Sequence, residues 1–337
     1  MKKQWILWIV SLVFVVFVFQ RIAEVGSIGV ILSQGKWQWV VLAFILQFIY
    51  YIIYARLYQK NFDIIGIKTS WRHLFPIVLS SLVVNVITPT AGLAGIALFV
   101  NDARQRGHSA GRAAVAIILT WVTNYSVLTL IVLIGFAYLH LIGELKRYEM
   151  VGAFVMSALI LFLAGFFVLA AKNSRLLHKF LLWLSNFANF IASFIRIKQP
   201  FDSDWAERST DEFVSAVKNV SKKRKDLVEI LGIALLLHLI QATILLCTFL
   251  AFYHFISVEM VIVGYSIIAL FRVISPTPEG IGVVEGVSAL FFRSLGISGS
   301  MSAIIVLMFR GITFWFPLIM GFLFLRRVIR ENKKPAD

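Results

Sequence analysis

Long apolar stretches recur along this chain of 337 residues, without alternation of apolar and polar positions. Six of them are long enough for a membrane-crossing helix, which needs about 20 apolar residues. These predicted spans are 4–20, 37–55, 113–137, 151–171, 226–251 and 301–325. A membrane β-barrel would instead alternate over segments of about ten residues. The pattern therefore predicts a single all-α polytopic membrane domain over 1–337.

Two further apolar stretches, 74–100 and 259–297, are interrupted near their middle. Each interruption combines proline, which removes a backbone donor and ends a helix, with glycine, which permits a tight bend. Each stretch is therefore predicted to form a broken re-entrant hairpin that leaves the membrane on the side from which it enters. The residues assigned to the breaks are Pro89, Gly92 and Gly95 in the first stretch, and Pro276, Pro278, Gly280 and Gly282 in the second.

The distribution of positive charge supports this topology. The formal net charge is +15, and the cytoplasmic loops of membrane proteins are enriched in Lys and Arg. If both hairpins are re-entrant, most of the 32 Lys and Arg residues fall on one side of the membrane. The prediction is a multi-pass cell-membrane protein with both termini in the cytoplasm. Its basic charge then needs no nucleic-acid partner.

The segment 172–225 is the only sizeable polar part of the chain. Its first half carries apolar residues at helical spacing from Leu177 to Ile195, which predicts an amphipathic helix on the inner leaflet. Its second half is charged and ends in a basic run at 222–225, as expected for a cytoplasmic connector that touches anionic lipid heads.

An internal repeat is visible at long range. One constant shift along the chain superposes three sets of positions: Thr88-Pro89 on Thr277-Pro278, Gly107 on Gly296, and Ser109 on Ser298. Repeat one covers 37–137 and repeat two covers 226–325, and each reads as helix, broken hairpin, helix. Because a single span, 151–171, separates them, the two units are predicted to have opposite orientation. This is the inverted-topology repeat of secondary transporters.

Charged residues within the bilayer are the main candidates for chemistry, since such charge is costly and is usually functional. Exposed N–H groups at a half-helix start, with arginine nearby, suit a phosphate. The candidate substrate-binding residues are Arg310, Arg272, Glu279, Glu285 and Thr277 in the second repeat, and Thr88, Thr90, Asn101 and Arg104 in the first.

Several of these candidates, and two further polar residues, have a purely structural alternative. Glu285 and Arg310 could form a buried ion pair that holds the hairpin against the last helix. Arg293 could reach the membrane surface by its long side chain. His238 suits a helix-contact residue better than a proton relay. Asn101 and Arg104 could belong to an interfacial loop.

Several catalytic signatures are absent from the sequence. It contains no phosphate loop of the type that binds ATP, no Cys/His metal cluster around its single cysteine, Cys247, and no Gly-x-Ser-x-Gly nucleophile motif. No cofactor or metal is therefore expected.

The second break carries a resemblance to a known family. Val273–Leu290, with Pro276-Thr277-Pro278-Glu279-Gly280, and the run Arg310–Pro317 resemble the signature of a flippase-like membrane family. This family is related to the transmembrane region of lysylphosphatidylglycerol synthases, and the first hairpin resembles its other half. Many members have Pro-Gly-Gly at 278–280, so Glu279 departs from the pattern. The resemblance implies translocation of aminoacylated phosphatidylglycerol or polyprenyl-phosphate-linked sugars, without synthase activity.

Three functions follow from these expectations. The first is a lipid transporter or flippase whose partners are anionic or phosphate-bearing membrane lipids, as a monomer or a homo-oligomer. The second is a membrane transferase acting on a lipid headgroup, with Glu279 or His238 as the base. The third is a non-catalytic membrane partner of envelope lipid or glycan synthesis. The opposed hairpins and the clustered charges favour the first.

Overall fold

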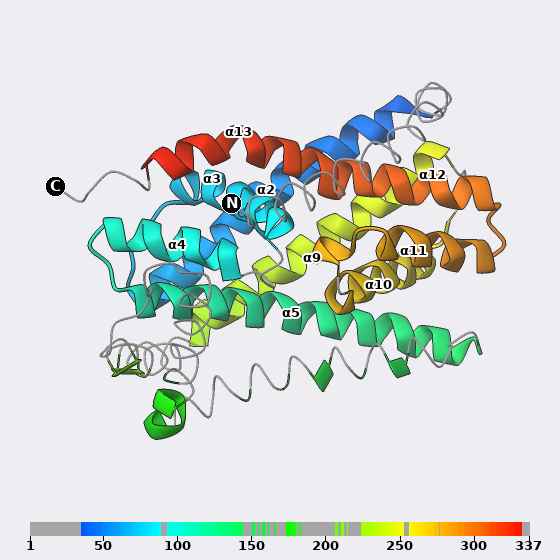
Figure 1. Ribbon diagram of the computed structural model, residues 1–337. Coiled ribbons are helices and arrows are strands. Elements are labelled where there is room, and N and C mark those ends of the chain that lie inside the picture. The colour runs from blue at the N-terminus through cyan, green and yellow to red at the C-terminus, as the bar shows by residue number, and fades with distance from the viewer. Residues whose placement is uncertain are drawn as a thin grey trace, which may run out of the picture.

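Helices dominate the computed structural model, which describes residues 35–88, 93–143, 224–252, 256–275 and 277–331, with separate residues and short stretches between 150 and 214 (Figure 1). No strand occurs within these residues. The helices of the first half are α2 (Trp37–Ile65), α3 (Trp71–Ile87), α4 (Leu93–Gln105) and α5 (Ala110–Leu141). Those of the second half are α9 (Arg224–Phe252), α10 (Val258–Ile274), η1 (Pro278–Gly280), α11 (Val283–Ser294), α12 (Gly299–Arg310), η2 (Gly311–Trp315) and α13 (Phe316–Glu331).

Four helices within the described residues are long and apolar enough to cross a membrane: Trp37–Ile65, Ala110–Leu141, Lys225–Phe252 and Gly299–Val328. They contain the predicted spans 37–55, 113–137, 226–251 and 301–325, so the prediction of a multi-pass helical membrane protein is confirmed. The prediction for 4–20, and most of those for 151–171 and 172–225, lie outside the described residues.

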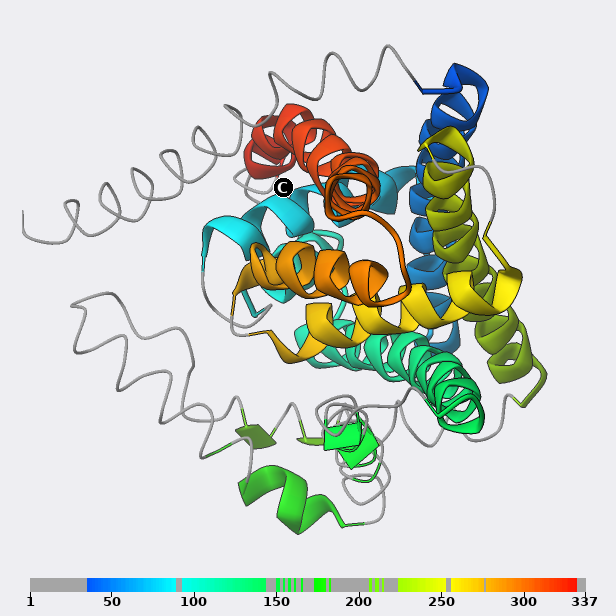
Figure 2. The same cartoon turned by 90° about the vertical axis from the view of Figure 1, so that its right-hand side faces the viewer.

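Both interrupted stretches form two helices with a break between them. The first stretch divides into α3 and α4, and the second into α10 and α11. Within each stretch the two helices pack against each other. Figure 2 shows α10 and α11 between the long helix formed by α12, η2 and α13 and the helix α5, while α2 and α9 run side by side along one flank.

Serine residues start four of these helices. Ser70, Ser109, Ser257 and Ser298 each accept a hydrogen bond from a backbone N–H in the first turn, at 3.2–3.4 Å. A serine cap of this kind satisfies one of the free N–H groups that every helix start leaves. The caps therefore set where α3, α5, α10 and α12 begin.

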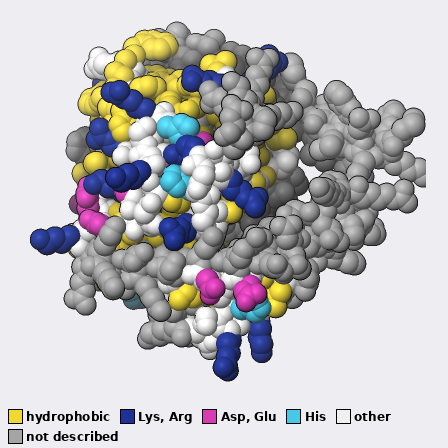
Figure 3. All heavy atoms as spheres, turned by 90° about the vertical axis from the view of Figure 1, so that its left-hand side faces the viewer, with side chains coloured by type: hydrophobic (Ala, Val, Ile, Leu, Met, Phe, Trp, Pro, Cys, Tyr) yellow, Lys and Arg dark blue, Asp and Glu magenta, His cyan; other side chains and the backbone are white. Residues whose placement is uncertain are grey.

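The outer surface is apolar along the length of the long helices and basic at one end of the molecule. Exposed apolar side chains such as Ile45 on α2, Leu239 on α9 and Leu323 on α13 suit contact with lipid. Figure 3 shows Lys, Arg and His side chains gathered on the face at the left of Figure 1, where α4 leads into α5. Lys68 and Arg72, beside the loop from α2 to α3, are also exposed.

A glycine lets α13 approach α3 closely. A Cβ built on Gly321 would overlap the carbonyl oxygen of Leu79 and crowd the side chain of Val83. Small residues allow such close backbone contact between membrane helices, where dispersion forces replace the hydrophobic effect. Gly135 has the same part in α5, where an added Cβ would meet Ser266 of α10.

We expect Gly321→Val to lower the apparent melting temperature of the purified protein in detergent. The added side chain forces α13 away from α3, and overpacking of this kind costs about 1–3 kcal/mol. Gly232→Val on α9 is the matched control, because no atom lies within 4 Å of a Cβ built there. Equal melting temperatures for the two variants would contradict this packing.

Candidate functional site

The second helix break is held in a tight, left-handed turn. Glu279, Gly280 and Gly282 have φ values of 52°, 73° and 83°. Glycine adopts this conformation freely, whereas a residue with a Cβ pays roughly 1–2 kcal/mol. Glu279 is the only non-glycine residue with positive φ in the described part of the chain. The predicted break residues Pro278, Gly280 and Gly282 thus lie in the turn, and Pro276 lies outside the described residues.

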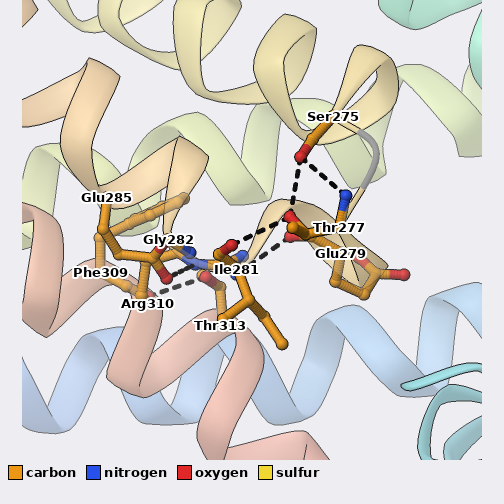
Figure 4. A network of polar contacts seen from close by, with 9 residues as sticks. All are labelled: Ser275, Thr277, Glu279, Ile281, Gly282, Glu285, Phe309, Arg310 and Thr313. Carbon is orange, nitrogen blue, oxygen red and sulfur yellow. Dashed lines mark hydrogen bonds and ion pairs between the residues drawn. The ribbon is translucent and has the colours of Figure 1, made fainter. Parts of the chain in front are cut away.

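Hydroxyl groups bind the polar backbone of this turn (Figure 4). The hydroxyl of Thr277 donates to the carbonyl oxygen of Ile281 at 2.9 Å and lies 2.8 Å from the hydroxyl of Ser275. The N–H of Thr277 donates to the same serine oxygen at 3.2 Å. Because an unpaired backbone group costs several kcal/mol in hydrocarbon, these bonds stabilise the interruption inside a membrane protein.

An ion pair ties the break to the last long helix. Arg310 Nε donates to Glu285 Oε1 at 2.8 Å, and Glu285 Oε2 accepts the N–H of Gly282 at 2.7 Å. A terminal nitrogen of Arg310 also donates to the carbonyl oxygen of Glu279 at 3.0 Å. The guanidinium lies over the ring of Phe314, 4.6 Å from its centroid. Two of the three guanidinium nitrogens of Arg310, whose side chain is 4% exposed, are therefore bonded within the protein.

The helix changes its winding directly after Arg310. Gly311–Trp315 forms a π-helix, which interrupts the ordinary hydrogen-bond ladder and is frequent at functional sites. Gln47 of α2 donates to the carbonyl oxygen of Thr313 at 3.5 Å and accepts from Gln241 of α9 at 3.2 Å. Two buried glutamines thus connect α2 and α9 to the π-helix.

Arg272 differs from Arg310 in its surroundings. It lies half-buried in the last turn of α10, and the Cβ position of Gly280 is 3.1 Å from its Cα, so the break folds directly over it. Its charge interacts with Glu279 and with Tyr50, Tyr125 and Tyr265. Within the described residues, however, Arg272 forms no hydrogen bond and no ion pair.

A ladder of tyrosines leads away from this arginine. Tyr50 and Tyr54 stack with ring centroids 5.8 Å apart, and Tyr54 meets Tyr58 edge-on at 5.1 Å. Tyr58 then stacks on Phe99 of α4 at 4.6 Å. The ladder therefore links the region of Arg272 to the first hairpin through one face of α2.

In the first hairpin, a polar side chain again bridges the break. Asn85 of α3 accepts the N–H of Gly95 in α4 at 2.8 Å, and a Cβ on Gly95 would overlap that asparagine. The hydroxyl of Thr88 donates to the carbonyl oxygen of Val84. The predicted residues Pro89, Thr90 and Gly92 lie outside the described residues.

The structure separates two other predicted residues from the second break. Asn101 and Arg104 are exposed in the last two turns of α4. Arg104 lies 11 residues beyond Leu93, which is about 16 Å along the helix axis. They therefore stand at the end of α4 that leads to α5, apart from the cluster formed by Thr277, Glu279, Glu285, Arg310 and Arg272.

His238 is a contact residue between three helices. Its Nε2 lies 3.0 Å from the carbonyl oxygen of Asn124, and its Nδ1 lies 2.7 Å from the hydroxyl of Tyr265. Since a carbonyl oxygen only accepts, Nε2 carries the proton, and in the neutral imidazole the tyrosine hydroxyl donates to Nδ1. Both nitrogens of His238 are thus occupied.

Arg293, whose long side chain could reach the membrane surface, lies in the last turn of α11 and is exposed.

Two features of this site were missed in the sequence. The tyrosines at 50, 54 and 58 recur every four residues and so share one face of α2, a spacing that could have revealed them. Gln47 and Gln241 carry no comparable signal, because isolated glutamines are common in membrane helices that contact one another.

Apolar spans and charged helix breaks define this chain as a multi-pass helical membrane protein. Residues 5–321 match the family described as the lysylphosphatidylglycerol synthase TM region, and the chain belongs to that family. It is 25% identical over 337 residues to a UPF0104 membrane protein of Methanocaldococcus jannaschii, covering 98% of this chain and 97% of the relative. It is 24% identical over 301 residues to a UPF0104 membrane protein of Methanothermobacter thermautotrophicus, covering 88% and 87%. No solved structure matches.

We expect Glu285→Ala to destabilise the protein by about 3–5 kcal/mol, because it leaves Arg310 buried without a counter-charge. Adding Arg310→Met should restore much of the loss. The measurement is the apparent melting temperature in detergent. Glu259→Ala is the control, because this carboxylate is exposed in the first turn of α10 and its removal should change the melting temperature little. Equal melting temperatures for Glu285→Ala and Glu259→Ala would show that the ion pair does not contribute to the stability of the fold.

Proposed function

We propose that this protein translocates a phosphate-bearing lipid across the cell membrane, with the headgroup phosphate bound at Arg272. The observation that carries the proposal is the half-buried position of Arg272 without a hydrogen bond or ion pair in the described residues. A charge withdrawn from water without a partner is costly, so a ligand that supplies the counter-charge offsets the cost. A planar guanidinium also binds phosphate through two parallel hydrogen bonds.

Two further donors lie within electrostatic range of this arginine. The hydroxyls of Tyr50 and Tyr125 form no hydrogen bond within the described residues, and both side chains interact with the charge of Arg272. They would donate to phosphate oxygens that the guanidinium leaves free. Arg310 has a different part in this proposal: it holds the break closed around Glu285 and does not contact the lipid.

Glu279 makes the site suitable for a headgroup that carries both charges. Its carboxylate interacts with Arg272 without forming an ion pair. An aminoacylated phospholipid presents an ammonium group close to its phosphate, and these would face Glu279 and Arg272 respectively. The family description supports this class, since it names a synthase of lysylphosphatidylglycerol. A polyprenyl-phosphate-linked sugar shares the phosphate and lacks the ammonium.

The proposed architecture is six full spans and two re-entrant hairpins in an inverted repeat. The packing of the helices supports it, because each contact in one half has a counterpart in the other. Helix α3 packs against α13, and its counterpart α10 packs against α5. Helix α4 packs against α5 as α11 packs against α12, and α2 packs against its own counterpart, α9.

Local geometry at matched positions also supports the repeat. Gly107 and Gly296 both have positive φ, 75° and 85°. Two residues further on, Ser109 and Ser298 both cap a helix start. In this arrangement the two breaks face each other within the membrane, and the basic end of the molecule lies in the cytoplasm.

We expect Arg272→Gln to slow lipid translocation at least about tenfold, because a charge-assisted hydrogen bond contributes about 1.5–3 kcal/mol. The assay is dithionite accessibility of fluorescent phosphatidylglycerol in vesicles that contain the purified full-length protein. A parallel series with lysylphosphatidylglycerol and with a polyprenyl phosphate tests the headgroup. Glu279→Gln should reduce transport of lysylphosphatidylglycerol more than transport of the polyprenyl phosphate.

The matched control for this assay is Arg293→Gln, which removes an exposed arginine from the same hairpin and should leave the rate unchanged. Melting temperatures establish that each variant is folded. Translocation at the wild-type rate by folded Arg272→Gln would contradict the proposed site.

A further inference from the structure

A groove on the outer surface has the composition of a second lipid site. It has a volume of about 530 Å³ and lies between α2, α9 and the start of α3. Ile53, Ile233 and Leu236 line one part of it, and Arg56, Lys60 and Glu229 line another. It shares no lining residue with the cluster around Arg272 and Arg310.

The groove changes from polar to apolar along the helix axes. On α2 the order is Lys60, Arg56, Ile53, which spans seven residues and about 10 Å. Helix α9 passes through the same change from Glu229 to Leu236, and Lys60 Nζ lies 2.7 Å from Glu229 Oε1 at the polar end. A gradient over this distance fits the boundary between lipid headgroups and acyl chains.

Positive charge is in excess around the aromatic ring at the polar end, where Arg72 lies over the ring without lining the groove itself. The guanidinium carbons of Arg56 and Arg72 lie 5.6 Å and 5.4 Å from the centroid of the Trp71 ring. Lys60 is paired with Glu229, whereas Arg56 and Arg72 have no carboxylate partner within the described residues. Both cations thus lie beside the same ring, and an anion bound near them would supply the carboxylate-like partner that each lacks.

The tryptophan is held in place by the protein itself. The backbone N–H of Trp71 donates to the side-chain oxygen of Gln59 on α2 at 3.0 Å. The start of α3 is therefore fixed beside α2 before any ligand arrives. Tryptophan is enriched at the level of lipid headgroups, where its ring meets the acyl chains and its N–H meets water.

We propose that this groove binds one anionic glycerophospholipid of the surrounding leaflet as a resident, non-transported lipid. Its phosphate lies against Arg56 and Arg72, its glycerol backbone lies beside Trp71, and one acyl chain follows Ile233 and Leu236 toward the membrane interior. Charge complementarity selects an anionic headgroup over a zwitterionic one, and the apolar end of the groove selects a lipid over a free phosphate.

The test is native mass spectrometry of the full-length Arg272→Gln variant in detergent, so that the proposed transport site does not contribute. The variant is titrated with phosphatidylglycerol or with phosphatidylcholine of the same acyl chains. We expect phosphatidylglycerol to bind at least about tenfold more tightly than phosphatidylcholine, and Arg56→Ala to remove that preference. The matched control is Arg326→Ala, which removes an exposed arginine from α13 and should retain the preference.

Competition identifies the source of the phosphate. Glycerol phosphate and an acidic peptide, each added at the concentration of the lipid, should fail to displace phosphatidylglycerol. The proposal is overturned if either displaces the lipid, if both lipids bind equally, or if adding Arg56→Ala leaves the preference unchanged. Because every variant in this assay already lacks Arg272, such a result leaves the proposed role of Arg272 untouched.

Discussion

A chain that interrupts a helix inside a bilayer has to pair each backbone group that the interruption frees, since lipid offers no hydrogen bonds. In this protein one carboxylate meets much of that need. Glu285 accepts the N–H of Gly282, at the start of α11, and holds Arg310 on the facing helix. Arg310 in turn binds the carbonyl oxygen of Glu279. The left-handed turn, the position of α11 and the attachment of the last helix all depend on this group of bonds.

Two arginines that look alike in the sequence, Arg310 and Arg272, differ in their contacts with this turn. Arg310 is occupied by the protein, with a carboxylate, a carbonyl oxygen and an aromatic ring around it. Arg272 is covered by the same turn, and its charge interacts with tyrosines and with Glu279 without a direct bond to any of them. One arginine stabilises the turn, and we propose that the other binds the ligand. The strained conformation of Glu279 is consistent with such a division, because its carbonyl serves Arg310 while its charge acts on Arg272.

Much of the fold could be predicted from the sequence, because its signals are local. Apolar length identified the long helices, and the prolines and glycines near 88–95 and 274–282 identified both interruptions. The site was only partly predictable. The sequence offered an ion pair between Glu285 and Arg310 as one of two interpretations, and could not decide which arginine was occupied, since that depends on contacts between helices distant in the chain. The π-helix at Gly311–Trp315 and the contact of Gln47 with it have no local signature.

The role of Arg272 can be tested by a cryo-electron microscopy structure of the protein in nanodiscs that contain an aminoacylated or other anionic phospholipid. We expect density for a lipid phosphate within hydrogen-bonding reach of the Arg272 guanidinium, with Arg310 still bound to Glu285. A phosphate bound at Arg310, or an Arg272 side chain fully bonded to protein groups with no lipid beside it, would rule out the proposed site.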